Sequence, residues 1–240
     1  VALGRCGRGD AARHVMAYLE HPRAEVRAAA AAALGHIGDA GQRDALWRAL
    51  RYPGEDPGFA VRAAALTAFV HLGWKADVAE AVKELRASGG LRHWMSRAAM
   101  LSAVGAAGLA EELDWVRREI ASEDPRIVAA AAGALARLGR TEEIHGLTAH
   151  GEPLVRRAAL VALQEAGDAR ALERARALVE TDPDTDVRFE AALVLEHGDH
   201  PDADVYLVDA LRARNPLYWI PALAALEKRH GRSFGRNADA

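Results

Sequence analysis

The chain has 240 residues, and half of them are hydrophobic but only 5% are aromatic, because about 55 are alanine. This composition, with few β-branched and aromatic side chains, favours helices packed closely on helices over β-sheet. The charged content of 27%, usual for a globular protein, excludes extensive disorder. The net charge of −3 does not indicate a polyanion-binding surface. No apolar run reaches the roughly 18 residues of a membrane-spanning helix.

One pattern recurs from the first residues to the last. It consists of a polar residue and Pro, then Val-Arg, an alanine-rich stretch, Leu and a closing Gly. Copies start at residues 21, 56, 124, 152, 182 and 215, and a further copy at Ser96-Arg97 lacks the polar-Pro start. The closing glycines are Gly7, Gly38, Gly73, Gly108, Gly139, Gly167, Gly198 and Gly231. Their spacing of 28 to 35 residues indicates a tandem repeat.

Each repeat predicts two helices. The second helix starts where the polar residue caps free amides and Pro occupies the first helical position, and it ends where Gly adopts a left-handed conformation. The first helix lies in the stretch after each glycine. The apolar faces of two second helices are Val26, Ala30, Ala33, Leu34 and Ile37, then Val61, Ala65, Ala68, Phe69 and Leu72.

The repeated core, from polar-Pro through Val-Arg to Ala-Ala-x-Ala-Leu-Gly, resembles the HEAT repeat. The resemblance is to the short alanine-rich type found in phycobilisome lyase subunits and many bacterial HEAT proteins, and it covers nearly the whole chain. We therefore expect an all-α, right-handed superhelical α-solenoid of about seven helical hairpins. It would form one domain over residues 1–240, with residues 232–240 as a C-terminal tail.

The recurring arginines allow two interpretations. Arg27, Arg62, Arg97, Arg156 and Arg188 could form a basic ladder that binds phosphates or acidic side chains. Alternatively, as the resemblance to HEAT repeats implies, each pairs with an acid in its own or a neighbouring turn. The candidate acids are Glu25, Asp56, Glu152 and Asp186. We favour the second interpretation.

The sequence offers few signs of a metal or catalytic site. His36 and His71 occupy equivalent positions, but stacked helices are about 10 Å apart, which predicts that they are too distant to share a metal. The run Glu196-His197-Gly198-Asp199-His200 is expected to be a polar helix end and turn. We predict no metal, no cofactor and no catalytic residue, and we leave open whether the protein is an enzyme while leaning against it.

Departures from the repeat single out two segments. Residues 88–96 replace the polar-Pro start with a turn and large side chains, including His93, Trp94 and Met95. Residues 217–221 place aromatic side chains in the last repeat, where they suit either a binding hot spot or a terminal cap. The lone Cys6 cannot form an internal disulfide, which predicts a reducing, cytoplasmic setting. Residues 1–7 are expected to be the end of a helix whose partner is missing.

The leading functional hypothesis is a non-catalytic protein-interaction scaffold. Its partner, another protein, would bind the concave face lined by the second helices, and the first residues to test are Arg62, Trp94, Arg97 and Arg188.

Two alternatives remain at this point. One is a HEAT-like DNA-binding protein or alkylpurine DNA glycosylase, for which the available residues are Trp74, Asp77, Trp94, Asp114 and Trp115. The net charge does not favour it. The other is a lyase-like or chaperone-like helper subunit, which would need an apolar pocket and a partner chain.

Overall fold

The computed structural model describes residues 8–38, 40–51, 58–88, 93–213 and 215–234, and every regular element within these ranges is a helix. The chain divides into two compact units, Val1–Leu138 and Gly139–Ala240, which we call the N-terminal and C-terminal units. The all-α prediction is confirmed for the described residues. One uninterrupted domain over residues 1–240 stays a prediction, and Cys6 with the rest of residues 1–7 lies outside the described part.

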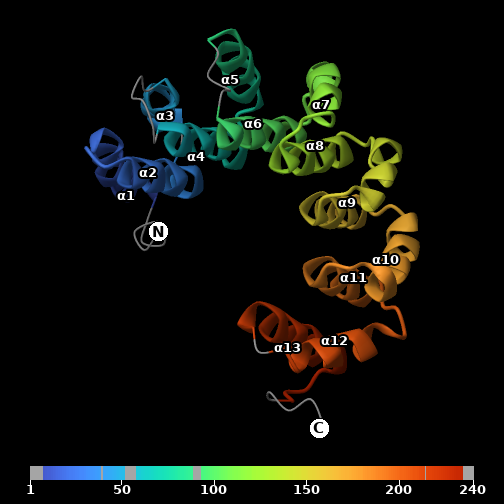
Figure 1. Ribbon diagram of the computed structural model, residues 1–240. Helices are drawn as coiled ribbons and strands as arrows, with labels where there is room; N and C mark the ends of the chain where they lie inside the picture. Colours follow the sequence, from blue (N-terminus) through green and yellow to red (C-terminus); the bar gives the residue numbers. More distant parts are fainter. Residues whose placement is uncertain (1–7, 39, 52–57, 89–92, 214, 235–240) are drawn as a thin grey trace. The chain divides into compact units, whose positions relative to one another are not determined.

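The N-terminal unit contains four helical hairpins in its described part (Figure 1). Each hairpin has a first helix and a second helix. The first helices are α1 (Arg8–Met16) with the 3-10 turn η2 (Ala17–Glu20), η3 (Ala40–Gln42) with α3 (Arg43–Leu50), α5 (Lys75–Ala87), and η4 (Ala110–Glu112) with α7 (Leu113–Glu119). The second helices are α2 (Ala24–Ile37), α4 (Gly58–His71), α6 (Trp94–Ala107) and α8 (Pro125–Arg137).

The C-terminal unit contains three hairpins in its described part, so the two units together match the predicted number of about seven. The first elements are η5 (Thr141–Glu143) with η6 (His145–Ala149), α10 (Arg170–Thr181) and α12 (Ala203–Leu211). The second helices are α9 (Pro153–Glu165), α11 (Thr185–His197) and α13 (Pro216–His230). The described helices include none long and apolar enough to cross a membrane.

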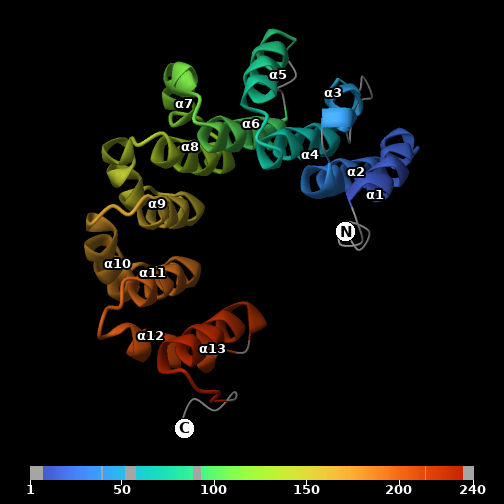
Figure 2. The same cartoon turned by 180° about the vertical axis from the view of Figure 1, so that it is seen from behind.

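Within each unit the second helices form a layer of their own. In the N-terminal unit α2, α4, α6 and α8 lie side by side, and α3, α5 and α7 cover one side of them (Figures 1 and 2). In the C-terminal unit α9 packs on α11, and α10 and α12 pack against α11. We call these rows of second helices the second-helix layers. Their remaining side is not covered by first helices.

The core lies between the first helices and the second-helix layer. One large apolar residue recurs seven positions after each recurrent arginine or its counterpart, and these residues are at most 1% exposed: Leu34, Phe69, Val104, Leu135, Leu163 and Leu195. Alanines fill the remaining contacts, for example Ala65 and Ala68, which are fully buried. The predicted apolar faces are therefore confirmed, except that Val26 and Leu72 at their ends are only half-buried.

Two helical glycines bring neighbouring second helices unusually close. A Cβ added at Gly35 of α2 would lie 2.8 Å from the Cα of Ala68 in α4. A Cβ added at Gly105 of α6 would lie 2.8 Å from the Cα of Ala134 in α8. Both contacts are shorter than a side chain tolerates, so glycine is required at these two crossings. The equivalent position in α4 is Val70, and there the helices cannot approach as closely.

The predicted helix ends need two corrections. Gly73, Gly108, Gly139, Gly167 and Gly231 have positive φ as expected, but Gly38 and Gly198 have φ of −74° and −89°. After α11 the left-handed position is taken by Asp199, with φ of 53°. A side chain at Gly198 would collide with Leu172, its Cβ lying 2.2 Å from Cδ2, so this glycine provides space for packing instead.

The polar-Pro pairs also fall into two classes. Asp124, Glu152 and Asn215 are N-caps with Pro at the next position, as predicted, although the side chain of Glu152 caps nothing. His21-Pro22 and Asp182-Pro183 lie earlier, because α2 and α11 are capped by Arg23 and Asp184. The two classes differ in the number of residues from the proline to the recurrent arginine. It is five in the copies at Pro22 and Pro183, and three from Pro153 to Arg156.

We predict opposite effects for two glycine-to-alanine substitutions. Gly105→Ala should lower the free energy of unfolding by about 1–3 kcal/mol, because the added methyl group must push α6 from α8. Gly133→Ala is the matched control, since its Cβ would meet only Arg137 Nη1 at 3.8 Å. It should stabilise the protein by up to about 1 kcal/mol through helix propensity. Urea unfolding followed by circular dichroism measures both, and equal effects would contradict the close crossing.

Candidate binding surface

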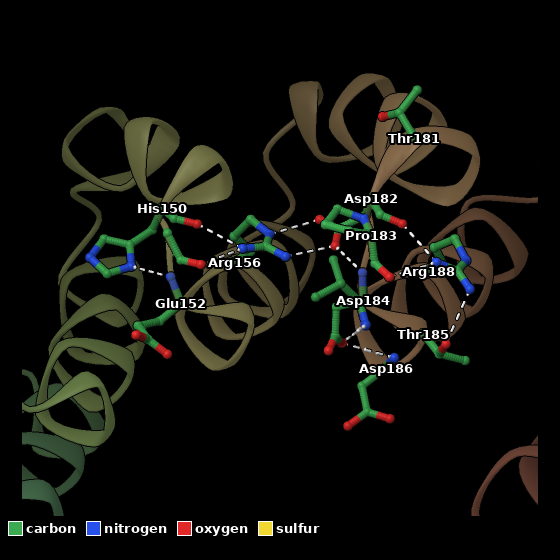
Figure 3. A network of polar contacts seen from close by, with 12 residues as sticks. His150, Glu152, Arg156, Thr181, Asp182, Pro183, Asp184, Thr185, Asp186 and Arg188 are labelled. Atoms are coloured by element: carbon green, nitrogen blue, oxygen red, sulfur yellow. Dashed lines mark hydrogen bonds and ion pairs between the residues drawn. The ribbon is translucent and has the colours of Figure 1, made fainter.

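The recurrent arginines bind the main chain of the turn that precedes their own helix. In each of Arg27, Arg156 and Arg188, Nη1 donates to the carbonyls five and six residues earlier, and Figure 3 shows this for Arg156 and Arg188. For Arg27 the acceptors are the carbonyls of His21 at 2.7 Å and Pro22 at 2.8 Å. For Arg156 they are those of His150 at 2.8 Å and Gly151 at 2.9 Å. For Arg188 they are those of Asp182 at 2.7 Å and Pro183 at 3.1 Å. The guanidinium thus satisfies two carbonyls that no helix can use.

In four of the turns a polar side chain two residues before the N-cap shapes the chain. His21, Ser122, His150 and Asp182 each accept a hydrogen bond from the backbone N–H of the N-cap residue, at 2.9 to 3.2 Å. This local bond folds the chain back on itself and leaves the carbonyl of the same residue for the arginine. The repeat motif therefore encodes a turn held by one polar side chain and one guanidinium.

Arg156 and Asp182 form a buried, two-pronged ion pair in the C-terminal unit. Arg156 Nε and Nη2 donate to the two carboxylate oxygens of Asp182, each at 2.7 Å, and the two side chains are 9% and 2% exposed. Burial alone would raise the pKa of Asp182, but the hydrogen bonds from Arg156 and the Asp184 amide outweigh it and hold the pKa below its ordinary value. The pair joins the turn of one hairpin to the turn of the next.

Arg97 makes an equivalent pair in the N-terminal unit, with Glu119 at the end of α7. Arg97 and Arg156 therefore pair with acids, but their partners are Glu119 and Asp182 and not the predicted acids. Of the predicted acids, Glu152 acts on Arg156 only through its charge. Glu25 contacts Arg23 at 3.7 Å and Asp186 contacts Arg157 at 3.8 Å. The carboxylates come from the end of the next hairpin's first helix because each guanidinium reaches past its own turn. The predicted acid Asp56 lies outside the described residues.

These contacts place two predicted binding residues at the turns. Arg97 and Arg188 extend toward the turn edge of their layers, where Arg188 Nη2 also donates to Thr185 Oγ1 at 3.1 Å. Arg62 is half-buried on α4. A substitution of Arg97 or Arg188 would change the turn as well as any binding surface. Their roles in binding a partner stay predictions.

Trp94 lies in a row of stacked side chains along the N-terminal ends of α4, α6 and α8. The rings of Phe59 and His93 stack with centroids 3.8 Å apart, and the His93 and Trp94 centroids are 5.8 Å apart. The guanidinium of Arg126 lies 4.1 Å from the centroid of Trp94, and it is held by Asp124 through bonds of 2.9 and 2.7 Å. Trp94 remains half-exposed at the edge of the layer.

A hollow of about 240 Å³ opens on the uncovered side of the N-terminal second-helix layer, between α4 and α6. It is lined by Thr67, Val70, Ala99, Ser102, Ala103, Ala106 and Arg137. Its position follows from the glycine pattern, since α4 carries Val70 where α2 and α6 carry Gly35 and Gly105. The sequence did not predict this hollow, because small exposed side chains give no conspicuous motif.

His36 and His71 are closer than predicted. Their ring centroids are 4.8 Å apart, so the expectation that helix spacing separates them was wrong. The cause is the close contact at Gly35, where an added Cβ would lie 2.8 Å from the Cα of Ala68 in α4. Within the described ranges no group of three or more His, Cys, Asp or Glu side chains could hold a metal ion. The pair is therefore a ring contact on the exposed side of the layer.

The residues available for the DNA glycosylase hypothesis have structural contacts of their own. Asp77 is buried in α5 and accepts hydrogen bonds from Arg43 Nε at 2.7 Å and Trp47 Nε1 at 2.6 Å. Trp115 is buried in α7. Neither side chain lies on the uncovered side of the second-helix layer, where that hypothesis needs them.

Comparison with protein-family models matches residues 1–69 and 144–227, more than half of the chain, to HEAT repeats. Among solved structures, YibA of Escherichia coli is 13% identical, with a TM-score of 0.55 over 95% of this chain and 88% of that chain. The complex of CpcE and CpcF of phycocyanin lyase from a Nostoc species is 23% identical, with a TM-score of 0.55 over 91% and 82%. At these identities both likenesses show the fold alone. A search of curated proteins found no match.

The buried pair predicts an acid-sensitive stability. Because the pKa of Asp182 is lower in the folded chain, its contribution is complete above the unfolded value of about 4 and is lost as the pH falls through the folded value. Asp182→Asn should cost about 3 kcal/mol at pH 7, since Arg156 keeps a buried charge without its counter-ion. The cost should shrink toward pH 3.

Urea unfolding at pH 7, 5 and 3 measures this cost. Asp114→Asn is the control, because the side chain of Asp114 is 85% exposed and its ion pair with Arg117 is long, at 3.4 Å. It should change stability by less than about 0.5 kcal/mol at every pH. Parallel pH profiles for Asp182→Asn and the wild type would contradict the assignment.

Proposed function

The chain belongs to the HEAT-repeat family, and from this premise we propose that it is a non-catalytic protein-binding module. Stacked helical hairpins expose long surfaces, and such surfaces commonly hold other macromolecules. The partner would lie across the uncovered side of the second-helix layer. The same surface is predicted from the sequence to bind a partner. Arg62, Trp94 and Arg97 remain proposed contributors at its edge in the N-terminal unit, and Arg188 remains one in the C-terminal unit.

The hollow between α4 and α6 is the observation that carries this proposal. Ala99, Ala103 and Ala106 are part of its lining, so a partner side chain can approach the backbone of α6. Thr67 and Ser102 are exposed hydroxyl groups at the same place. The Thr67 hydroxyl donates to the carbonyl of Ala63 at 2.9 Å, so toward a partner it can accept a hydrogen bond, and Ser102 can donate or accept. An apolar surface with a few polar groups suits insertion of a large side chain from another protein.

Trp94 extends this surface toward the turns. It begins α6, the helix that also carries Ala99, Ser102 and Ala106. Its position beneath Arg126 fixes the ring, and a fixed aromatic ring loses little entropy when it contacts a partner. We therefore place Trp94 at one end of the proposed contact and the hollow further along the same helix.

A helper subunit of a two-chain assembly is the second candidate. The observation that favours it is the likeness to the complex of CpcE and CpcF of phycocyanin lyase. It predicts the same mode of contact, with another protein on the exposed helices. A nucleic-acid partner is less favoured, since the net charge is −3 and Arg137 is the one basic side chain that lines the described hollow.

Two alanine-to-arginine substitutions test the proposed surface. Ala106→Arg places a long charged side chain in the hollow, and it should weaken partner binding about tenfold or more by blocking insertion. Ala87→Arg is the matched control, because Ala87 is also exposed near the end of a helix but lies on α5, in the first-helix row. Its binding should equal that of the wild type.

The measurement has two stages. Tagged wild type and both variants capture proteins from cells of the source organism, and quantitative mass spectrometry identifies proteins that Ala106→Arg loses and Ala87→Arg retains. Titration calorimetry with the purified partner then gives the affinities. Equal capture by all three proteins would refute the surface, and retention of duplex DNA in a mobility-shift assay, weakened by Ala106→Arg, would assign it to nucleic acid instead.

A further inference from the structure

Arg188 lacks the carboxylate that completes the contacts of Arg156. Both guanidiniums use Nη1 for two turn carbonyls (Figure 3). The Nε and Nη2 edge of Arg156 is occupied by both oxygens of Asp182, each at 2.7 Å. The same edge of Arg188 makes one hydrogen bond, to the neutral hydroxyl of Thr185 at 3.1 Å, and no acid pairs with it among the described residues.

The difference arises from one position in the next turn. Asp182 stands two residues before the N-cap Asp184 of α11. The residue two positions before Asn215, the N-cap of α13, is Ala213. A methyl group therefore occupies the place where the preceding hairpin supplies the acid. Arg188 therefore repeats the turn contacts of Arg156 but has no acid in the place of Asp182.

A cavity of about 370 Å³ with Arg188 in its lining lies inside the C-terminal unit. Its lining includes Arg188, Arg212, Ala213, Phe189, Tyr206 and Tyr218. The Phe189 and Tyr218 rings meet edge to face, with centroids 5.3 Å apart. The cavity therefore combines a basic end with aromatic walls.

The tyrosine hydroxyls are already engaged. Tyr206 donates to Glu180 at 2.8 Å, and Tyr218 donates to Asp186. These hydrogen bonds raise the pKa of both phenols, so the hydroxyls stay protonated and bound to the acids. Their rings remain as apolar walls. Asp209, the acid in the lining, lies 3.6 Å from Arg212. Asp182, whose charge is also influenced by Arg188, is already paired with Arg156.

We propose that this cavity binds a carboxylate carried on an aromatic body. The carboxylate accepts two hydrogen bonds from Nε and Nη2 of Arg188, as Asp182 does from Arg156, and the ring packs against Phe189, Tyr206 and Tyr218. A two-pronged guanidinium contact with an aromatic wall is a favourable receptor for such an acid. A free aromatic acid and the C-terminal aromatic residue of a peptide share this chemistry.

The site is independent of the hollow in the N-terminal unit. Its failure would leave the contact proposed at that hollow untouched, and the reverse also holds. Arg188 would then contribute to ligand binding through the cavity at the turn edge, in addition to holding the turn carbonyls of Asp182 and Pro183.

The probe is phenylacetate, titrated into the ¹⁵N-labelled full chain and followed by amide chemical shifts. We expect saturable shifts centred on Thr185, Phe189 and Ala210. Phenylacetamide lacks the charge and acetate lacks the ring, so each should bind at least about tenfold more weakly. Acetate binding as tightly as phenylacetate, or shifts that do not saturate, would overturn the proposal.

Two peptides separate the sources of the acid. A tetrapeptide that ends in phenylalanine with a free carboxylate is compared with its C-terminal amide. Tighter binding of the free peptide than of phenylacetate assigns the cavity to chain ends. Binding of phenylacetate without binding of the peptide assigns it to small acids. Equal binding of the peptide and its amide would overturn the role of the carboxylate.

The decisive variant is Ala213→Asp, which supplies the missing acid from the chain itself. It should abolish phenylacetate binding and leave the fold intact, because it copies the pair of Arg156 with Asp182. Arg188→Lys keeps the charge without the two-pronged edge and should bind about tenfold more weakly. Arg157→Lys, outside the cavity, is the control and should bind as the wild type does. Unchanged binding by Ala213→Asp would overturn the proposal.

Discussion

The hydrogen bonds from one guanidinium nitrogen to two consecutive carbonyls hold the two helices of a hairpin together at their turn. Arg27, Arg156 and Arg188 each make this pair of hydrogen bonds. If the guanidinium were removed, the two turn carbonyls would lose their protein donor. Because the turn is fixed, the second helix leaves it in a defined direction and its alanine-rich face meets the next second helix. The core and both exposed surfaces depend on that direction.

The fold could be predicted from the sequence because its signals are local and repeated. Spacing of the closing glycines and the Val-Arg motif define hairpins, and the apolar face of Ala30, Leu34 and Ile37 is a simple helical period. The helix ends that differed from the prediction are determined by tertiary contacts. Gly198 supplies space for Leu172, and the left-handed turn moved to Asp199, a difference that only the contact between α10 and α11 decides.

The candidate sites were harder to predict because they depend on distances between helices. His36 and His71 were expected to be far apart, but the crossing at Gly35 brings their rings to 4.8 Å. The hollow arises from Val70, an unremarkable residue whose effect appears only beside Gly35 and Gly105. At the cavity of Arg188, Ala213 stands two residues before its N-cap, where the preceding hairpin has Asp182, and this correspondence requires the positions of the N-caps in the structure.

The alternation of glycine and valine along the N-terminal layer also sets where that unit is stiff. At Gly35 and Gly105 the backbones of two pairs of helices, α2 with α4 and α6 with α8, are in direct contact and have little room to slide. The seam between α4 and α6 has side chains and the hollow instead. Motion within the unit should therefore concentrate at that seam, with two stiff helix pairs moving against each other. A molecule that fills the hollow would act as a wedge and fix the angle between them.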